Sequence, residues 1–212
     1  MKRKIEIRHD ISGNKIVVIN DILFRGKRCV CWDDVEVYLK LYIGDLYTIS
    51  DTNEVIYISK DLPDEYTGSK YTRSLKGGYA KAKANAAQGI PELIQTAMNK
   101  RYKENLQSKH QMNAKYGWYR YDSMFAIPVF DERGEISRYN IFTAEILIRH
   151  DADGKMYLYD IINIKKETSN PPGLMRTVKN PFLKYIIMRK CENVNKILES
   201  GYKKVDRLAM QK

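Results

Sequence analysis

The residues of this chain that could do chemistry suit cleavage of RNA without a metal ion. That reaction needs a base for the 2'-hydroxyl, an acid for the leaving oxygen and cations for the phosphorane. Candidates for acid and base are His110 and Asp160, and candidates for the cation are Lys76, Arg120 and Lys165. The set is chemically sufficient, but any basic protein of 212 residues contains such residues, so the set alone does not identify a nuclease.

Two histidines could supply an imidazole that titrates near neutral pH. His110 lies beside Lys109, between a predicted helix and a predicted sheet. As an isolated residue it is better explained as an exposed histidine at a helix C-terminus, where a positive charge is favourable. His150 could supply a second imidazole, although a turn histidine held by Asp151 or Asp153 explains it more simply.

A run of aromatic and basic residues opens a predicted strand at Trp118. Because side chains alternate along a strand, Trp118 and Arg120 point to one face, and Tyr119 and Tyr121 point to the other. An aromatic ring beside a guanidinium on an open face suits base stacking and phosphate binding. A core tryptophan with an arginine reaching to the edge fits the same residues, so both interpretations stay open.

The net charge favours a polyanionic partner. The chain carries 37 Lys and Arg against 26 Asp and Glu, a net charge of +11. From Lys165 onward there are twelve basic and four acidic residues, so +8 of the +11 lies in that part. Nucleic acid, with RNA favoured, is the first candidate and a membrane surface the second. The predicted nucleic-acid contacts are Lys76, Lys109, Trp118, Tyr119, Tyr121, Lys165, Lys166, Lys184, Arg189 and Lys190.

The middle of the chain predicts an antiparallel β-meander. Three segments rich in β-branched and aromatic residues, 118–130, 139–149 and 155–164, are joined by Asp- and Gly-containing connections. Before them, short strands are expected within 3–31 and over 54–59, with a helix over 34–43 whose buried face is Val35, Tyr38, Leu39 and Tyr42. Helices are also expected over 69–87, from Pro91 to about Ser108, and from Pro181 to about Ser200.

These elements predict an α+β fold, because the helices run together and then the strands run together. The expected architecture is two helices followed by a three- to four-stranded antiparallel sheet, with a small β-rich N-terminal portion and a basic C-terminal helix. The expected divisions are residues 1–60, the nuclease-like core 61–166, and a linker with the basic helix at 167–212.

Several classes of function are disfavoured by what the sequence lacks. We expect no secretory signal, because no apolar segment follows the charged N-terminus. The sequence has no apolar run near the ~18 residues of a membrane span, and no nucleotide or zinc-protease motif. Cys29, Cys31 and Cys191 form no C-x-x-C pair, so we expect free thiols in the cytoplasm and neither a metal site nor a cofactor. Gly77-Gly78 after Lys76 is a weak phosphate-loop cue, explained more simply as a helix start.

A family resemblance extends over about half of the chain, from Asp61 to Lys166. The residues that carry it are Lys70–Gly77, Lys81–Lys83, Ile90–Ile94, Lys109-His110, Gly117–Tyr121 and Tyr159–Ile164. They resemble domains of the large polyvalent proteins of phages and conjugative elements, a group similar to the barnase–EndoU–colicin–RelE class of small ribonucleases. The resemblance implies N-terminal helices followed by a four-stranded antiparallel sheet.

The resemblance also implies functional positions: Lys76, His110, Trp118, Arg120 and Asp160. The chain departs from the pattern in lacking a second well-placed catalytic histidine or a clear glutamate base, which puts activity in doubt even if the fold is right. Our first hypothesis is therefore a metal-independent RNase-like protein of a phage or mobile element. The alternative is a non-catalytic nucleic-acid- or protein-binding factor for host takeover or anti-defence, with a host or immunity protein as a further partner.

Overall fold

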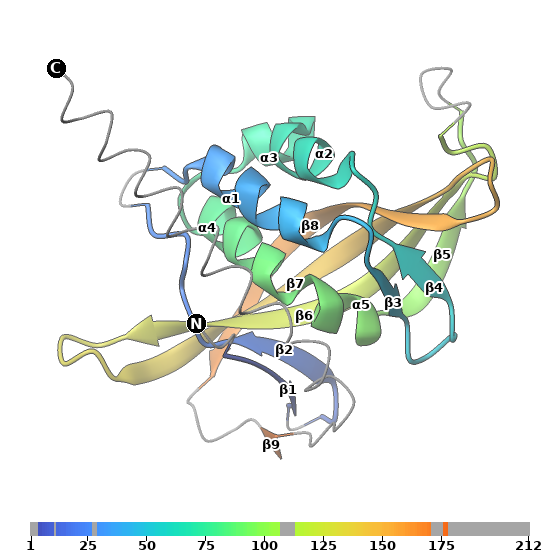
Figure 1. Cartoon of the computed structure of the whole chain (residues 1–212). Helices are drawn as coiled ribbons and strands as arrows, with labels where there is room; N and C mark the ends of the chain where they lie inside the picture. Colours follow the sequence, from blue (N-terminus) through green and yellow to red (C-terminus); the bar gives the residue numbers. More distant parts are fainter. Residues whose placement is uncertain (1–3, 11, 27–28, 107–112, 171–175, 178–212) are drawn as a thin grey trace, which may run out of the picture. The chain divides into compact units, whose positions relative to one another are not determined.

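The structure is a computed structural model and describes residues 4–10, 12–26, 29–106, 113–170 and 176–177 of the chain. Residues Ile5–Thr177 form one compact unit, which is the part described below. Its elements are one curled sheet and a set of short helices that lie over one face of it (Figure 1).

The sheet has nine strands in the order β3-β4-β8-β7-β6-β2-β1-β9, with β5 also paired to β6. The strands are β1 (Ile5–His9), β2 (Lys15–Ile19), β3 (Leu46–Thr48), β4 (Val55–Tyr57), β5 (Met98–Lys103), β6 (Trp118–Phe130), β7 (Ile136–His150), β8 (Met156–Asn170) and β9 (Arg176–Thr177). The three long strands β6, β7 and β8 pair antiparallel and form its centre. Two pairings are parallel, β2 with β6 and β4 with β8.

Aspartate- and glycine-containing turns set the register of the central meander. In the β6–β7 turn, the Asp131 carboxylate accepts hydrogen bonds from the backbone N–H groups of Arg133 and Glu135. The N–H of Gly134 donates to the Asp131 carbonyl, and its φ of +81° is a conformation that glycine adopts without steric cost. The β7–β8 turn from Asp151 to Gly154 repeats the same backbone hydrogen bond. These are the turns that the sequence predicts.

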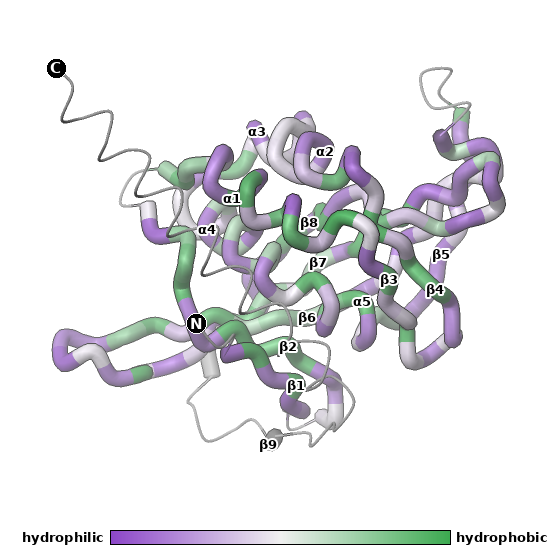
Figure 2. Tube along the Cα trace, in the orientation of Figure 1, coloured by the Kyte–Doolittle hydropathy of each residue, from purple (hydrophilic) through white to green (hydrophobic). Residues whose placement is uncertain are grey.

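The helices are α1 (Trp32–Leu39), α2 (Leu62–Gly68), α3 (Lys70–Ser74), α4 (Gly77–Ala86) and α5 (Ile90–Gln95). The main core lies between them and the sheet, and α4 contributes mainly alanines to it, which let this helix approach the strands closely. A smaller cluster on the opposite face contains Ile16, Val18, Ala126, Tyr139 and Ile141. Figure 2 shows the corresponding pattern, with hydrophobic residues along the central strands and hydrophilic residues on β5 and at the tip of the β6–β7 hairpin.

The expected fold class is wrong. The chain is a mixed α/β structure with a nine-stranded curled sheet, not two helices followed by three or four strands. The strands expected at 118–130, 139–149 and 155–164 are present, but strands from residues 5–57 join the same sheet at both sides of them. Those additions depend on parallel pairings between segments far apart in the chain, and strand patterns do not reveal such partners.

Two helix expectations also need correction. The helix expected from Pro91 to about Ser108 ends at Gln95, and the residues from Met98 to Lys103 form β5 instead, paired antiparallel with β6. The helix expected over 69–87 is divided into α3 and α4 at Leu75-Lys76. The helix expected over 34–43 is confirmed as α1 and the following 3-10 turn, with the predicted residues buried. The expected C-terminal helix lies outside the described residues.

Residues 5–60 share the core and the sheet of the later residues, so the expected boundary near residue 60 does not divide Ile5–Thr177 into two compact units. One contact that holds them together is made by Asn85 of α4. Its side-chain amide accepts a hydrogen bond from the backbone N–H of Phe24 and donates one to the carbonyl of the same residue, each at 3.2 Å. This pair of bonds fixes the β2–α1 connection on α4.

We predict that Asn85→Ala lowers the free energy of unfolding by roughly 2–4 kcal/mol, because two buried backbone groups lose their partner and each such loss costs ~1–3 kcal/mol. Denaturant unfolding measures it. Lys81→Ala on the same helix is the control, because the Lys81 side chain forms no ion pair within the described part of the chain and its backbone is kept; it should change the value by less than about 0.5 kcal/mol. Equal effects of the two substitutions would contradict this role of Asn85.

Candidate functional site

The structure separates the residues that the sequence groups as one site. Five of them lie outside the described residues: Lys109, His110, Lys184, Arg189 and Lys190. The others occupy four different environments. These are the interior beneath α4, the face of the sheet at Arg120, the end of the sheet where β5 ends and β6 begins, and the surface beside α4.

Asp160 lies in the interior, where it forms an ion pair with Lys83 of α4. The Lys83 Nζ–Asp160 Oδ1 distance is 2.5 Å, and the two side chains are 0% and 2% exposed. The ammonium lies 4.6 Å from the centre of the Tyr66 ring and 5.0 Å from that of Tyr71. The remaining carboxylate oxygen accepts a hydrogen bond from Ser69 at 3.0 Å. A carboxylate enclosed in this way has no contact with a substrate, so the expectation that Asp160 is catalytic is not supported by its position.

Burial disfavours both charges of this pair. It lowers the pKa of Lys83 and raises the pKa of Asp160 to about 6, while each partner's charge acts in the opposite direction. The close contact of the Lys83 ammonium with the Asp160 carboxylate favours the charged form of both groups. The pair therefore holds α4 against β8 only while both charges are present, because either charge alone would be buried without compensation.

Arg120 belongs to a network of charged side chains on the sheet. Its guanidinium donates to Glu145 at 3.0 Å. Arg101 of β5 donates to the two oxygens of Asp122 at 2.6 and 2.9 Å and lies 3.5 Å from Glu145. The Arg101 guanidinium lowers the pKa of Asp122. Two cations and two carboxylates thus largely neutralise one another, which makes Arg120 a weak candidate for holding a phosphate.

Four rings form a continuous series at the end of the sheet, which we call the tyrosine ladder: Tyr102, Tyr119, His150 and Tyr116. Successive ring centres are 5.4, 5.9 and 5.0 Å apart. The two end members are open to solvent, with Tyr102 59% and Tyr116 45% exposed, whereas Tyr119 and His150 are half-buried between them. Exposed rings in a row are what base stacking requires.

Gly117 positions the ladder. Its φ is +89°, and a Cβ at this residue would lie 2.6 Å from the Tyr102 ring, so the ring packs directly on the glycine backbone. Gly117 O accepts a hydrogen bond from His150 N, and His150 O accepts one from Tyr116 N. These bonds hold the residues before β6 against the end of β7 and bring rings from three segments together.

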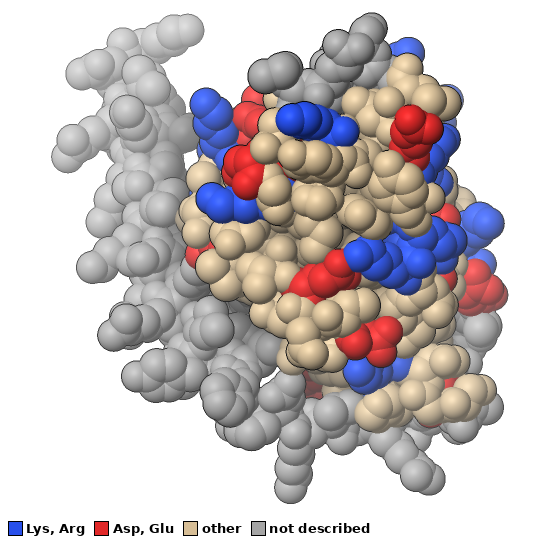
Figure 3. Space-filling model, turned by 90° about the vertical axis from the view of Figure 1, so that its right-hand side faces the viewer, with Lys and Arg blue, Asp and Glu red and all other residues tan. Residues whose placement is uncertain are grey.

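Basic side chains accompany the ladder. The Lys100 ammonium lies 4.3 Å from the centre of the Tyr119 ring and pairs with Glu54. The Lys115 ammonium lies 5.3 Å from the centre of the Tyr116 ring, and Lys103 is exposed. Within the described ranges, neither Lys103 nor Lys115 forms an ion pair. Figure 3, which looks onto this side of the molecule, shows Lys and Arg side chains interspersed with acidic ones rather than one unbroken basic patch.

The remaining predicted contacts on β6 are integrated into the fold. Trp118 packs edge-on against Tyr159 at 4.9 Å, and its indole N–H donates to the Asn105 side chain at 3.4 Å. Tyr121 is buried and donates its hydroxyl to Glu54 at 2.6 Å, and both burial and that carboxylate raise its pKa. Trp118 is half-buried, so the structure agrees better with the edge-of-core interpretation than with an open stacking platform.

The three predicted lysines from other elements are exposed and lie apart from the ladder. Lys76 precedes the first turn of α4. Lys166 of β8 lines a groove beside that helix, and Lys165 lines a different, polar hollow with Asp122 and Glu145. The sequence-based site therefore combines residues at the start of β6 with lysines that lie on other surfaces.

The ladder members that sequence reasoning missed are Tyr102 and Tyr116. The expected helix over 91–108 placed Tyr102 on a solvated helix end, where a ring has no partner. The sequence carries no local signal for their position, because it follows from the pairing of Lys103 with Trp118, which places the end of β5 beside the start of β6.

Comparison with known proteins gives no match, either among protein-family models, among curated proteins or among solved structures. Over the described part of the chain, no group of three or more His, Cys, Asp or Glu side chains is arranged to hold a metal ion. None of the helices described is long and apolar enough to span a membrane.

The Lys83–Asp160 pair yields a test of whether Asp160 is structural. We predict that Asp160→Asn lowers the free energy of unfolding by about 3–5 kcal/mol, because it leaves the Lys83 ammonium buried without its counter-ion. The double variant Lys83→Met/Asp160→Asn should lose clearly less than the sum of the two single variants, since it removes the uncompensated charge. Denaturant unfolding of all four proteins gives the coupling free energy. Additive losses would contradict the pair's role.

Proposed function

We propose that this protein binds single-stranded RNA, with bases stacked on the tyrosine ladder and phosphates held by the lysines around it. The observation that carries the proposal is the pair of exposed rings, Tyr102 and Tyr116, at the two ends of a row of four aromatic groups. An exposed tyrosine pair of this kind has no role in the core, and an unpaired base offers a flat face of matching size and polarity.

Single-stranded RNA fits better than a duplex. In a duplex the bases are stacked on one another and their faces are not available, whereas proteins bind single strands by splaying bases onto aromatic side chains. Lys103 and Lys115, which have no ion-pair partner among the residues described, are the ladder's available phosphate contacts. The excess of basic residues from Lys165 onward adds a long-range attraction for the same polyanion.

We predict that Tyr102→Ala and Tyr116→Ala each weaken RNA binding. Stacking contributes about 1–3 kcal/mol per base, so the Kd should rise roughly five- to 150-fold for each substitution. Fluorescence anisotropy with a labelled, unstructured RNA at fixed salt measures this change. Tyr102→Phe and Tyr116→Phe are the matched controls and should keep most of the affinity, because the ring remains. Unchanged Kd values for both alanine variants would remove the ladder from RNA binding.

A second candidate function is metal-independent cleavage of RNA, and the position of His150 favours it. This imidazole lies inside the ladder, 5.0 Å from the Tyr116 ring centre, and its Nε2 contacts the Gly154 carbonyl at 3.3 Å, not a carboxylate of the turn. Lys103 and Trp118, which flank Lys109 and His110 in the sequence, are paired at this end of the sheet. In this candidate His110 and His150 serve as acid and base, and Asp160 has no part.

The candidate is tested with a mixed RNA pool in EDTA. If the protein is a nuclease, the wild type produces fragments with 2',3'-cyclic phosphate ends, and His110→Ala and His150→Ala reduce the rate by about 10²-fold or more while RNA binding persists. Tyr116→Phe is a control for the ring environment and should cleave normally. Absence of cleavage by the wild type, with RNA retained, leaves the binding function and rejects the nuclease.

The resemblance to polyvalent proteins of phages and conjugative elements supports a wider proposal. In it, the protein acts in the cytoplasm as a host-takeover or anti-defence factor, with a host or immunity protein as a further partner. RNA would then be the ligand through which the factor acts. Toxicity of the wild type on expression, relieved by the ladder variants, is the expected sign of that role.

A further inference from the structure

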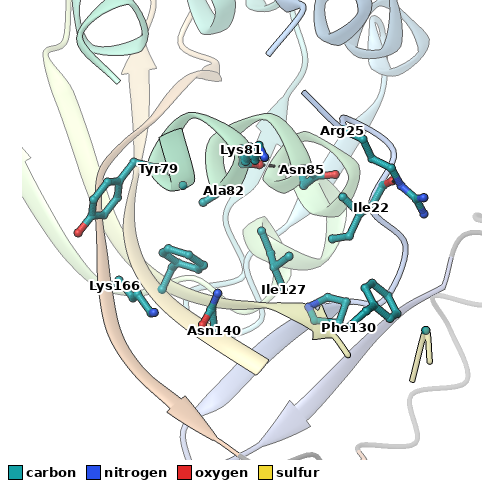
Figure 4. Close-up of a pocket in the computed structure, with 14 residues that line it drawn as sticks. Ile22, Arg25, Tyr79, Lys81, Ala82, Asn85, Ile127, Phe130, Asn140 and Lys166 are labelled. Carbon is teal, nitrogen blue, oxygen red and sulfur yellow. Dashed lines mark hydrogen bonds between the residues drawn. The ribbon is translucent and has the colours of Figure 1, made fainter. Parts of the chain in front are cut away.

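A second surface of the chain has the composition of a ligand site and is not used by the ladder. It is a groove of about 750 Å³ between α4 and the far ends of β6, β7 and β8, shown in Figure 4. Its lining residues come from α4, from the three long strands, from the β6–β7 turn and from the β2–α1 connection. We call it the α4 groove.

The charged residues that line the α4 groove are all cations: Arg25, Lys81 and Lys166. Among the described residues that line it there is no carboxylate, although acidic side chains accompany the cations at the ladder. Within the described part of the chain, none of the three forms an ion pair. Their charges are therefore available to an anion, and three cations around one groove are costly unless an anion or solvent compensates them.

The rest of the lining is apolar and aromatic. Ile127, Phe142 and Ala82 provide an apolar surface, and Phe142 is fixed by stacking on Phe125 at 5.2 Å. Tyr79 of α4 and Phe130 at the end of β6 are 45% and 43% exposed, so both rings are open to solvent. Figure 4 shows these two rings on opposite sides of the groove.

The first turn of α4 leaves the groove accessible at its N-terminal end. Gly78 lines the groove, and a Cβ at this position would meet nothing within 4 Å. The chain therefore presents bare backbone here beside Tyr79, next to the cations of the groove. Glycine followed by an aromatic residue lets a flat group approach the helix closely.

From these features we propose that the α4 groove binds a nucleoside phosphate, with the base against the apolar surface beside Tyr79 or Phe130 and the phosphate held by Lys81, Lys166 and Arg25. A volume of this size accommodates a mononucleotide. Flat rings and apolar side chains suit the base, and a cluster of cations without carboxylates suits the phosphate.

The basic end of the chain is a poor alternative occupant. Residues 178–212 contain nine Lys and Arg against three Asp and Glu, a net charge of +6. A positively charged segment would meet three cations in the groove, whereas a nucleoside phosphate brings the opposite charge. The groove therefore favours an external anion over this part of the chain.

The test is isothermal titration of the full-length protein with the four ribonucleoside monophosphates as probes, with inorganic phosphate and adenosine as separate controls. The proposal expects at least one monophosphate to bind in the micromolar to low millimolar range, more tightly than either control, because only it engages both parts of the groove. Lys81→Ala and Lys166→Ala should each raise its Kd by about tenfold. Lys155→Ala, an exposed lysine of the β7–β8 turn, is the matched control and should leave the Kd unchanged.

Two further variants separate this groove from the ladder. Tyr79→Leu should weaken monophosphate binding and Tyr79→Phe should keep it, while Tyr102→Ala should not affect it. Binding of none of the four probes at millimolar concentration would overturn the proposal. So would a Kd unaffected by both groove lysines, or one that rises with Tyr102→Ala, since the probe would then occupy the RNA surface.

Discussion

The buried ion pair between Lys83 and Asp160 is the constraint on which the rest of the unit depends. It joins α4 to β8 in the main core, where the alanines of α4 allow close approach. Two charges in such a place are favourable only with each other and with the Ser69 hydroxyl that completes the carboxylate's hydrogen bonds. The pair therefore fixes the position of α4, and through Asn85 of the same helix it also fixes the β2–α1 connection.

This arrangement separates the buried charges from the surfaces that we propose as ligand sites. The most polar group of the interior is enclosed by Tyr66 and Tyr71 and serves the fold. The residues available to a ligand lie at the margins, on the tyrosine ladder and in the α4 groove. Lys81 and Lys83 show the separation within one turn of helix: residues two apart face different sides, so one lysine lines the groove and the other is buried.

The sequence predicts the local structure well and the long-range structure poorly. The strands of 118–164 and the helix of 34–43 follow from alternation, periodicity and turn residues, which are local. The parallel pairings of β2 with β6 and of β4 with β8 join distant segments, and nothing local specifies them. Met98–Lys103 carries lysines and a tyrosine that suit a solvated helix equally well, so β5 was missed.

The same limit applies to the site. The start of β6 can be proposed as a site from Trp118 to Tyr121. Its partners Tyr102 and Tyr116 become visible only once β5 is placed beside it, and the burial of Asp160 depends on which lysine of α4 points inward.

The central claim is that RNA contacts the tyrosine ladder rather than only the basic residues near the end of the chain. Photo-crosslinking of the wild-type protein to an RNA containing 4-thiouridine, followed by mass spectrometry of the peptides, tests it directly. The account predicts adducts at Tyr102, Tyr116 or Tyr119 that are lost when unlabelled RNA competes. Competed adducts confined to residues 165–212, with none on the ladder, would contradict it and assign RNA binding to the basic segment alone.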